Sequence, residues 1–324
     1  MSSNSSFIEC VRKYTRLSFP LPLNTHDITD NLHWWKNDYF DTNAIKPSFS
    51  SSASDYSFTS CTFHHLSSAE NGGALYCACG KSLIIEQCIF NQCSTSAEES
   101  TERFGGGAIF INCGTISVTY TAFISCSTSS YAGGMLVEDD CTSSVVSFCT
   151  FFSCTAKFGG GLMTFWGPTC SMFSSRVISC TSFIAGGGLY HNGYTSDWLN
   201  IVDTLFTQNT AETLWDGYEH RGGGALESFR NNSYDSYFSF SFFTGNVAKR
   251  TYGHDITIQT VKLSADCVSH SLTTAISNSF WNVDDHVLNW LPRGILLYTI
   301  NCSADSSANT PHTNIEMVSN KVHF

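Results

Sequence analysis

Cysteine recurs most regularly among the residues that could do chemistry. Cys93, Cys126, Cys154 and Cys180 close successive copies of one short motif. Stacked copies would lie about 4.8 Å apart, the spacing of neighbouring strands. That spacing suits a ladder of free thiols and also disulfides, whose Cα atoms lie about 4.4 to 6.8 Å apart. We expect a structural, reduced ladder. Disulfides and a metal site are the alternatives, although a straight column does not converge as four zinc ligands must.

Two acidic clusters could support carbohydrate cleavage. Glu138, Asp139 and Asp140 are consecutive, and so are Asp284 and Asp285. Paired carboxylates serve as acid and base in glycosidases, and carboxylates also bind calcium. Neighbouring residues on a strand face opposite sides, and no basic residue accompanies these in the chain, so we expect solvated loops. A carbohydrate-active β-helix enzyme, lyase or hydrolase, is therefore the alternative function.

One mixed aromatic and polar region is the candidate binding site. Its two parts, residues 210–221 and 249–252, carry ring platforms and forked donors of the kind that dominate recognition. The predicted binding residues are Trp215, Asp216, Tyr218, Glu219, His220, Arg221, Lys249, Arg250 and Tyr252. The rings could equally fold back over the flank of the molecule. We expect a glycan or protein partner here, and we predict no catalytic residue, metal site or cofactor.

Glycine runs divide the chain into the repeats that must position these residues. The last glycines of the runs are Gly73, Gly107, Gly134, Gly161, Gly188 and Gly224. They follow one another by 34, 27, 27, 27 and 36 residues. No run is followed by G-K-[ST] at the spacing of a phosphate-binding loop, so we expect tight turns or close backbone approach instead of phosphate-binding loops.

Three apolar columns accompany the glycines. An F-x-x-[CN] signature is centred on Phe63, Phe90, Phe123, Phe151, Val177, Phe206 and Phe243. Five residues earlier lie Phe58, Ile85, Val118, Val146, Met172, Ile201 and Phe238. Two residues after the last glycines lie Leu75, Ile109, Leu136, Met163, Tyr190 and Leu226. Such columns predict an all-β fold, a right-handed parallel β-helix of about seven to eight coils, each with roughly 27 residues and three short strands.

The repeat pattern also predicts the domain organisation. Residues 1–55 should cap the first coil, residues 56–285 should form the helix, and residues 286–324 should cap the last coil. Insertions gather between each Cys or Asn and the next glycine run, and the longest are residues 94–104 and 210–221. In a solenoid such insertions map to one face, which is often the binding face.

Composition limits the partners. Charged residues make up 13% of the chain, against about 25% in ordinary proteins, and the net charge is −11. That charge argues against nucleic acid and anionic membrane surfaces as partners. No apolar run is long enough to span a bilayer, and Pro20 and Pro22 interrupt the apolar stretch near the start. We therefore expect no membrane insertion, a cytoplasmic location by default, and a monomer.

The pairing of G-G-A-[ILM] with F-x-x-N resembles the repeat of the polymorphic outer-membrane proteins and of similar cysteine-rich repeat families in protozoan parasites. Residues 72–75, 106–109 and 223–226 match the first half, and residues 206–209 and 243–246 match the second. The resemblance implies a β-helical, surface-displayed and often adhesive protein, which makes the cell surface the alternative location. The chain departs from the bacterial members because Cys replaces Asn in four of the seven copies.

Overall fold

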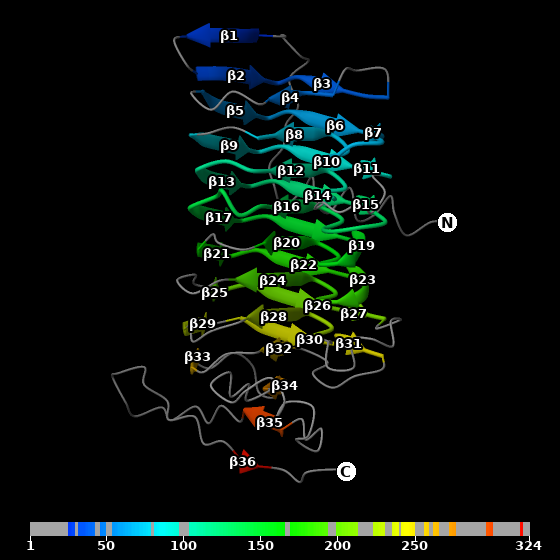
Figure 1. Cartoon of the computed structure of the whole chain (residues 1–324), viewed down its shortest axis with the longest axis vertical. Coiled ribbons are helices and arrows are strands. Elements are labelled where there is room, and N and C mark those ends of the chain that lie inside the picture. Colours follow the sequence, from blue (N-terminus) through cyan, green and yellow to red (C-terminus); the bar gives the residue numbers. More distant parts are fainter. Residues whose placement is uncertain are drawn as a thin grey trace, which may run out of the picture.

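The computed structural model describes residues 25–29, 32–42, 46–49, 54–78, 81–96, 104–165, 169–193, 199–212, 223–230, 235–239, 241–249, 256–258, 262–265, 272–276, 296–300 and 318–319. These residues form strands and no helix, which confirms the predicted all-β class. The strands belong to four sheets that run side by side along the molecule (Figure 1).

Sheets A and B form the first two sides of each coil. Sheet A has the order β1 (Thr25–Thr29), β2 (Leu32–Lys36), β5 (Asp55–Thr59), β9 (Ser82–Glu86), β13 (Thr115–Thr119), β17 (Ser143–Ser147), β21 (Thr169–Phe173), β25 (Leu199–Val202), β29 (Asp235–Ser239) and β33 (Lys262–Ala265). Sheet B has the order β3 (Tyr39–Phe40), β6 (Thr62–His64), β10 (Ile89–Asn91), β14 (Ala122–Ile124), β18 (Thr150–Phe152), β22 (Arg176–Ile178), β26 (Leu205–Thr207) and β30 (Phe242–Thr244).

Sheets D and C complete each coil. Sheet D has the order β7 (Ser67–Ser68), β11 (Ser94–Thr95), β15 (Ser127–Thr128), β19 (Thr155–Phe158), β23 (Thr181–Ala185), β27 (Thr210–Ala211) and β31 (Val247–Ala248). Sheet C has the order β4 (Ser48–Phe49), β8 (Leu75–Cys77), β12 (Ile109–Ile111), β16 (Met135–Val137), β20 (Leu162–Phe165), β24 (Leu189–Gly193), β28 (Leu226–Arg230), β32 (Ile256–Ile258), β34 (Leu272–Ile276), β35 (Leu296–Ile300) and β36 (Val318–Ser319).

Each coil visits the sheets in the order A, B, D and C, so the prediction of three strands per coil was wrong. The missing strand is in sheet D, where most strands have only two residues. A two-residue strand leaves no alternating pattern in the sequence. For this reason the predicted loops 94–104 and 210–221 began too early: their first two residues are β11 and β27.

The apolar column that was predicted by counting two residues from the last glycine of each run was also out of register in the three middle coils. The structure pairs Ile109 with Met135, Met135 with Leu162, and Leu162 with Leu189. The prediction had placed Leu136, Met163 and Tyr190 in that column. The last glycine is not equivalent in all coils, because Gly134, Gly161 and Gly188 stand where other coils have Ala74, Ala108 and Ala225. A slip of one residue moves a side chain to the other face of the sheet.

The glycines themselves play both expected roles. The first residue of the turn before sheet C has positive φ, as at Gly159 and Gly186 with 62° and 63°. The next glycine lies where two coils approach closely. A Cβ atom on Gly160 would lie 2.2 Å from the carbonyl oxygen of Gly187. Only glycine fits there, because real Cβ atoms do not come so close to backbone atoms.

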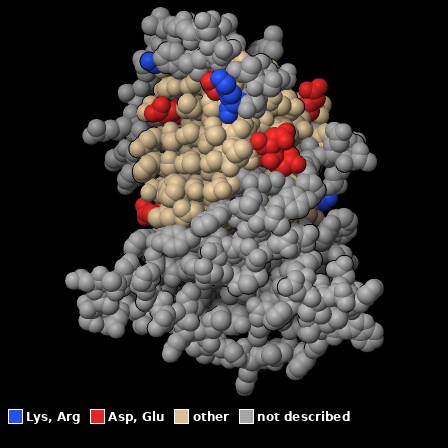
Figure 2. All heavy atoms as spheres, turned by 60° about the vertical axis from the view of Figure 1, so that its left-hand side comes forward, with Lys and Arg blue, Asp and Glu red and all other residues tan. Residues whose placement is uncertain are grey.

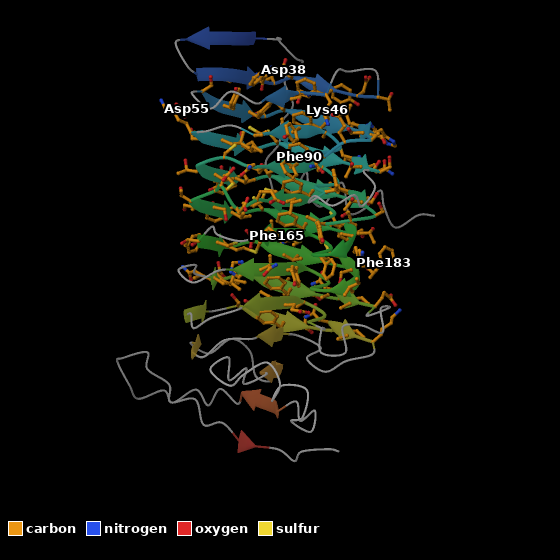
Figure 3. The ribbon with its side chains drawn as sticks, in the orientation of Figure 1. Asp38, Lys46, Asp55, Phe90, Phe165 and Phe183 are labelled. Atoms are coloured by element: carbon orange, nitrogen blue, oxygen red, sulfur yellow. The ribbon has the colours of Figure 1, made fainter. Side chains whose placement is uncertain are left out.

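The core is a stack of rings inside the four sheets. The centroids of Phe63 and Phe90 lie 4.5 Å apart, and those of Phe123 and Phe151 lie 4.7 Å apart, with nearly parallel planes. Figure 3 shows Phe90 in the middle of this stack. Val177 interrupts the stack, and Phe206 and Phe243 continue it. All six predicted Phe side chains of this column are buried, as expected.

A second apolar cluster lies on the outer face of sheet C and was not predicted. It joins Phe110, Leu136, Met163 and Tyr190 of sheet C to side chains that include Phe158 and Ile184. The last two belong to β19 and β23, which are longer than the other sheet D strands and bring apolar residues over sheet C. Outward-facing residues of sheet C are therefore buried in these coils.

The described ends of the stack break the parallel pattern. At the first end β1 pairs antiparallel with β2, which itself is parallel to β5. At the other end β35 pairs antiparallel with β34, and β36 pairs antiparallel with β35. Antiparallel hairpins change the edge that the last parallel strand would otherwise present for association with another chain.

Candidate functional site

The predicted binding region is described only at its edge. Lys249 is the one predicted binding residue within the described part of the chain. Trp215, Asp216, Tyr218, Glu219, His220, Arg221, Arg250 and Tyr252 lie outside it. The Lys249 ammonium group donates a hydrogen bond of 2.6 Å to Oε1 of Glu212, one coil earlier. The backbone N–H of Lys249 also donates to the carbonyl of Ala211 at 3.0 Å. The described starts of the two predicted loops therefore lie against each other.

The acidic cluster after β16 differs from the expected solvated loop. Asp139 and Asp140 are exposed, but Glu138 is buried. Asp140 accepts a hydrogen bond of 2.8 Å from the Asn112 amide, which in turn accepts from the Asp140 N–H. These contacts make Asp140 part of a turn that joins two coils. Asp284 and Asp285 lie outside the described residues.

Two tight corners hold seven of the described cysteines, including the four of the predicted ladder. Two residues join sheets A and B in each coil, and two more join sheets B and D. The first residue of such a corner has positive φ, and the second points into the core. Cys93, Cys126, Cys154 and Cys180 occupy the inner position of the B–D corner on four successive coils, where they are buried free thiols. The predicted ladder thus has the expected geometry in the structure.

Cysteine and asparagine do the same work at this corner. The thiols of Cys126 and Cys154 lie 3.5 Å from the carbonyl oxygens of Phe90 and Phe123 on the preceding coil. In a later coil the amide of Asn209 donates to the equivalent carbonyl of Val177 at 2.9 Å. Each side chain directs its polar group to a carbonyl of the preceding coil, so that the buried polar atom has a partner. This contact explains why Cys replaces Asn in the repeat.

The A–B corner uses thiols and hydroxyls in the same way. The thiol of Cys149 lies 3.2 Å from the carbonyl of Ser147, and the hydroxyl of Ser175 donates to the carbonyl of Phe173 at 2.7 Å. Ser175 also accepts a hydrogen bond from the N–H of Cys149. Burial raises the pKa of Cys149 to about 12. A thiol with this pKa is protonated at neutral pH and is a poor nucleophile.

A third group of cysteines lies where sheet C turns toward sheet A. The sulfur atoms of Cys77 and Cys113 are 3.5 Å apart. Cys113 is disulfide-bonded, but not to Cys77, since a disulfide bond is only about 2.05 Å long. The N–H of Cys113 donates to the sulfur of Cys141 at 3.1 Å. Burial raises the pKa of Cys141 to about 12. Within the described residues, no three His, Cys, Asp or Glu side chains come together as a metal site.

A buried polar pair was missed by the sequence reasoning. Thr164 and His191 are neighbours in sheet C, and the Thr164 hydroxyl contacts Nδ1 of His191. Both side chains are fully buried, and Ser228, the next residue in register, is also buried. Water and substrate do not reach such a position, so the pair stabilises the interior. The only signal in the sequence is a polar residue where neighbouring coils have Val137 or Ile111.

The exposed corner positions between sheets A and B hold an aromatic pair that was also missed. Tyr120 and Phe148 lie on neighbouring coils with ring centroids 4.8 Å apart and an angle of 7° between the rings. Their relative exposures are 49% and 50%, among the largest for apolar residues in the described chain. Both have positive φ, of 50° and 54°. Corner residues fall outside the apolar columns, so pattern analysis gives them no role.

Comparisons with protein-family models, curated proteins and solved structures gave no match to this chain. The part of the chain that the structure describes contains no helix long and apolar enough to cross a membrane.

Proposed function

We propose that the four sheets form one right-handed parallel β-helix and that this helix is a non-catalytic scaffold that binds a glycan or protein partner. Parallel strands joined by crossover connections are almost always right-handed, which supports the handedness. The resemblance to polymorphic outer-membrane repeats supports a role in adhesion.

The observation that carries the proposal is the unequal variation of the corners. The A–B and B–D corners have two residues in every described coil. The connection between sheets D and C varies in length. It is short in two coils, residues 159–161 and 186–188, and long in two others, residues 96–108 and 212–225. The connection between sheets C and A varies much less, from residues 112–114 to residues 138–142. A scaffold that keeps two corners constant while the D–C edge changes most in length is suited to presenting loops.

Charge and position favour the second long connection as the binding edge. Glu212 and Lys249 begin neighbouring loops, and their ion pair holds the two loop starts together. The first long connection, after β11, lies four strands away in sheet D, or about 19 Å at the usual strand spacing. We infer that residues 212–222 and 249–252 form one patch and that the earlier loop acts separately.

The test is an array of glycans and polyuronates read for both binding and cleavage. We expect binding without cleavage, and cleavage of any glycan would refute the non-catalytic role. A Trp215→Ala, Tyr218→Ala double variant should lose the bound partner and keep its melting temperature, because loops contribute little to the stacking of coils. A fall in melting temperature instead would show that these rings pack against the helix.

A further inference from the structure

A single ridge of corner residues runs along the boundary of sheets A and B. Its members have positive φ and belong to successive coils. They are Asn37, Ser60, Gln87, Tyr120, Phe148, Ser174 and Asp203. Backbone hydrogen bonds tie each step to the next, as between the N–H of Tyr120 and the carbonyl of Ser147 at 3.1 Å. Hydrogen bonds between coils therefore hold the backbone of the ridge in place when no ligand is bound.

The second tight corner serves as a control within the same molecule. It has the same length, and the first residue of each copy has the same positive φ. These first residues are His65, Gln92, Ser125, Ser153, Ser179, Gln208 and Gly245. All seven are polar or glycine. Left-handed backbone favours glycine and small polar residues and disfavours bulky side chains. The backbone therefore does not require Tyr120 and Phe148, and their exposure means that the core does not require them either.

Polar pairs bracket the two rings on the ridge. On one side the hydroxyl of Ser60 donates to the amide oxygen of Gln87 at 3.3 Å. On the other side the hydroxyl of Ser174 donates to Oδ2 of Asp203 at 2.8 Å. The sequence of groups along the ridge is thus polar, aromatic and polar, over seven coils. It offers ring surface at the centre, an oriented amide group on one side of the rings and an oriented carboxylate group on the other.

Charge indicates the kind of ligand. Residues 115–124 and 143–152 contain the sheet A and sheet B strands of the two aromatic coils and the corner between them, and they contain no Asp, Glu, Lys, Arg or His. Figure 2 shows one side of the stack on which the described surface is largely uncharged. The neighbouring coils place Glu86 beside Thr119 and Arg176 beside Thr150, one charge of each sign. Opposite charges favour neither an anionic nor a cationic ligand, whereas an uncharged ligand gives up no ionic hydration on binding there.

We propose that this ridge is a second binding site, distinct from the corner loops, and that it takes a linear, uncharged oligosaccharide lying along the axis of the stack. A pyranose ring has an apolar face of C–H groups, which can pack on the ring surface that stays exposed where Tyr120 and Phe148 stack on each other, and hydroxyls that pair with amide and carboxylate groups. A protein partner fits less well, because stable interfaces need about 800 Å² on each side and this ridge is one residue wide.

The experiment is calorimetric titration of the full chain with cellohexaose and mannohexaose, with a trigalacturonate as the charged comparison. We expect a neutral hexasaccharide to bind and the charged oligomer to bind at least tenfold more weakly. A Tyr120→Asn, Phe148→Asn double variant should lose at least tenfold in affinity. Asn tolerates the left-handed conformation, so the melting temperature of this variant should stay the same or rise.

The matched control is Ser125→Asn, Ser153→Asn, which places the same residue on the same two coils at the other corner. This variant should bind as the unmodified chain does. Phe183→Ala, which removes a ring with 41% exposure elsewhere on the stack (Figure 3), should also bind normally.

Three results would overturn the proposal: no binding of either neutral hexasaccharide, tighter binding of the charged oligomer, or unchanged affinity of the double Asn variant. A double Asn variant that melts as early as a core variant would also overturn it, since the rings would then be packing residues. The Trp215→Ala, Tyr218→Ala variant separates this site from the loop patch, because it should still bind the hexasaccharide.

Discussion

Replacing single glycines with alanine should separate the two roles that glycine has in this stack. Gly160 lies between coils, and an added Cβ would lie 2.2 Å from the carbonyl oxygen of Gly187 and 2.7 Å from the backbone N of Thr181. Both are backbone atoms held by coil-to-coil hydrogen bonds such as Gly160 N–H to the Gly186 carbonyl at 3.1 Å. We expect Gly160→Ala to reduce the free energy of unfolding by about 3 kcal/mol or more, at the upper end of overpacking costs.

Gly245 is the matched control because it has positive φ without crowding. Its φ is 63°, and the nearest atom to an added Cβ is Cγ of Gln208 at 3.7 Å, an ordinary contact. Gly245→Ala should therefore cost only the left-handed backbone, about 1 to 2 kcal/mol. Urea unfolding followed by far-UV circular dichroism measures both losses. Equal losses, or a Gly160→Ala variant as stable as the unmodified chain, would refute the assignment of close approach at Gly160.

Three further predictions concern the core and its thiols. Phe123→Ala should cost about 3 to 5 kcal/mol in thermal or urea unfolding, as for other buried aromatic rings, and a Phe123→Asp variant with unchanged melting would contradict the ring stack. Cys149 has its folded pKa raised to about 12, so its stabilising effect is complete below the unfolded pKa near 9 and is lost as the pH rises from there toward 12. At pH 10 this thiol alone should lower the free energy of unfolding by about 1.4 kcal/mol. The Cys149→Ser variant should lack this loss when urea unfolding curves at pH 8 and pH 10 are compared. An equal loss in the variant and the unmodified chain would contradict the predicted link between thiol ionisation and stability. Counting thiols after alkylation at lysis, in denaturant and without reductant, should find the four ladder cysteines free, and paired ladder cysteines would reverse the expectation of a reduced ladder.

The sequence alone was sufficient to predict the parallel, all-β class and the ring stack. Phe90 and Phe123 repeat at positions that pair directly in the structure, and a buried column of this kind leaves a strong pattern. The same reasoning failed at sheet C. Counting from the last glycine treated Gly134 and Gly107 as equivalent, although Gly134 corresponds to Ala108. Small residues are interchangeable at that point in the turn, so composition does not reveal the register.

The candidate sites were harder to predict than the fold for a physical reason. Buried columns are constrained by packing and therefore repeat, whereas an exposed corner is free to carry any side chain that its backbone tolerates. Tyr120 and Phe148 stand at such corners, and each looks like an unremarkable residue between strands until the stack places them together.

The replacement of Asn by Cys connects the repeat pattern to a final test. Cys180 precedes Asn209 in the inner column, and its backbone N–H donates to Oδ1 of Asn209 at 2.9 Å. Asn209 and Asn246 repeat this contact one coil later, with 3.0 Å between the Asn209 N and Oδ1 of Asn246. Cys180→Asn should therefore extend an existing ladder and change the free energy of unfolding by less than about 1 kcal/mol, the typical net worth of one hydrogen bond. Cys180→Leu keeps an apolar side chain but removes the donor, so it should cost more in the same urea titration. If the leucine variant were the more stable of the two, the column would be apolar packing and the equivalence of thiol and amide would be wrong.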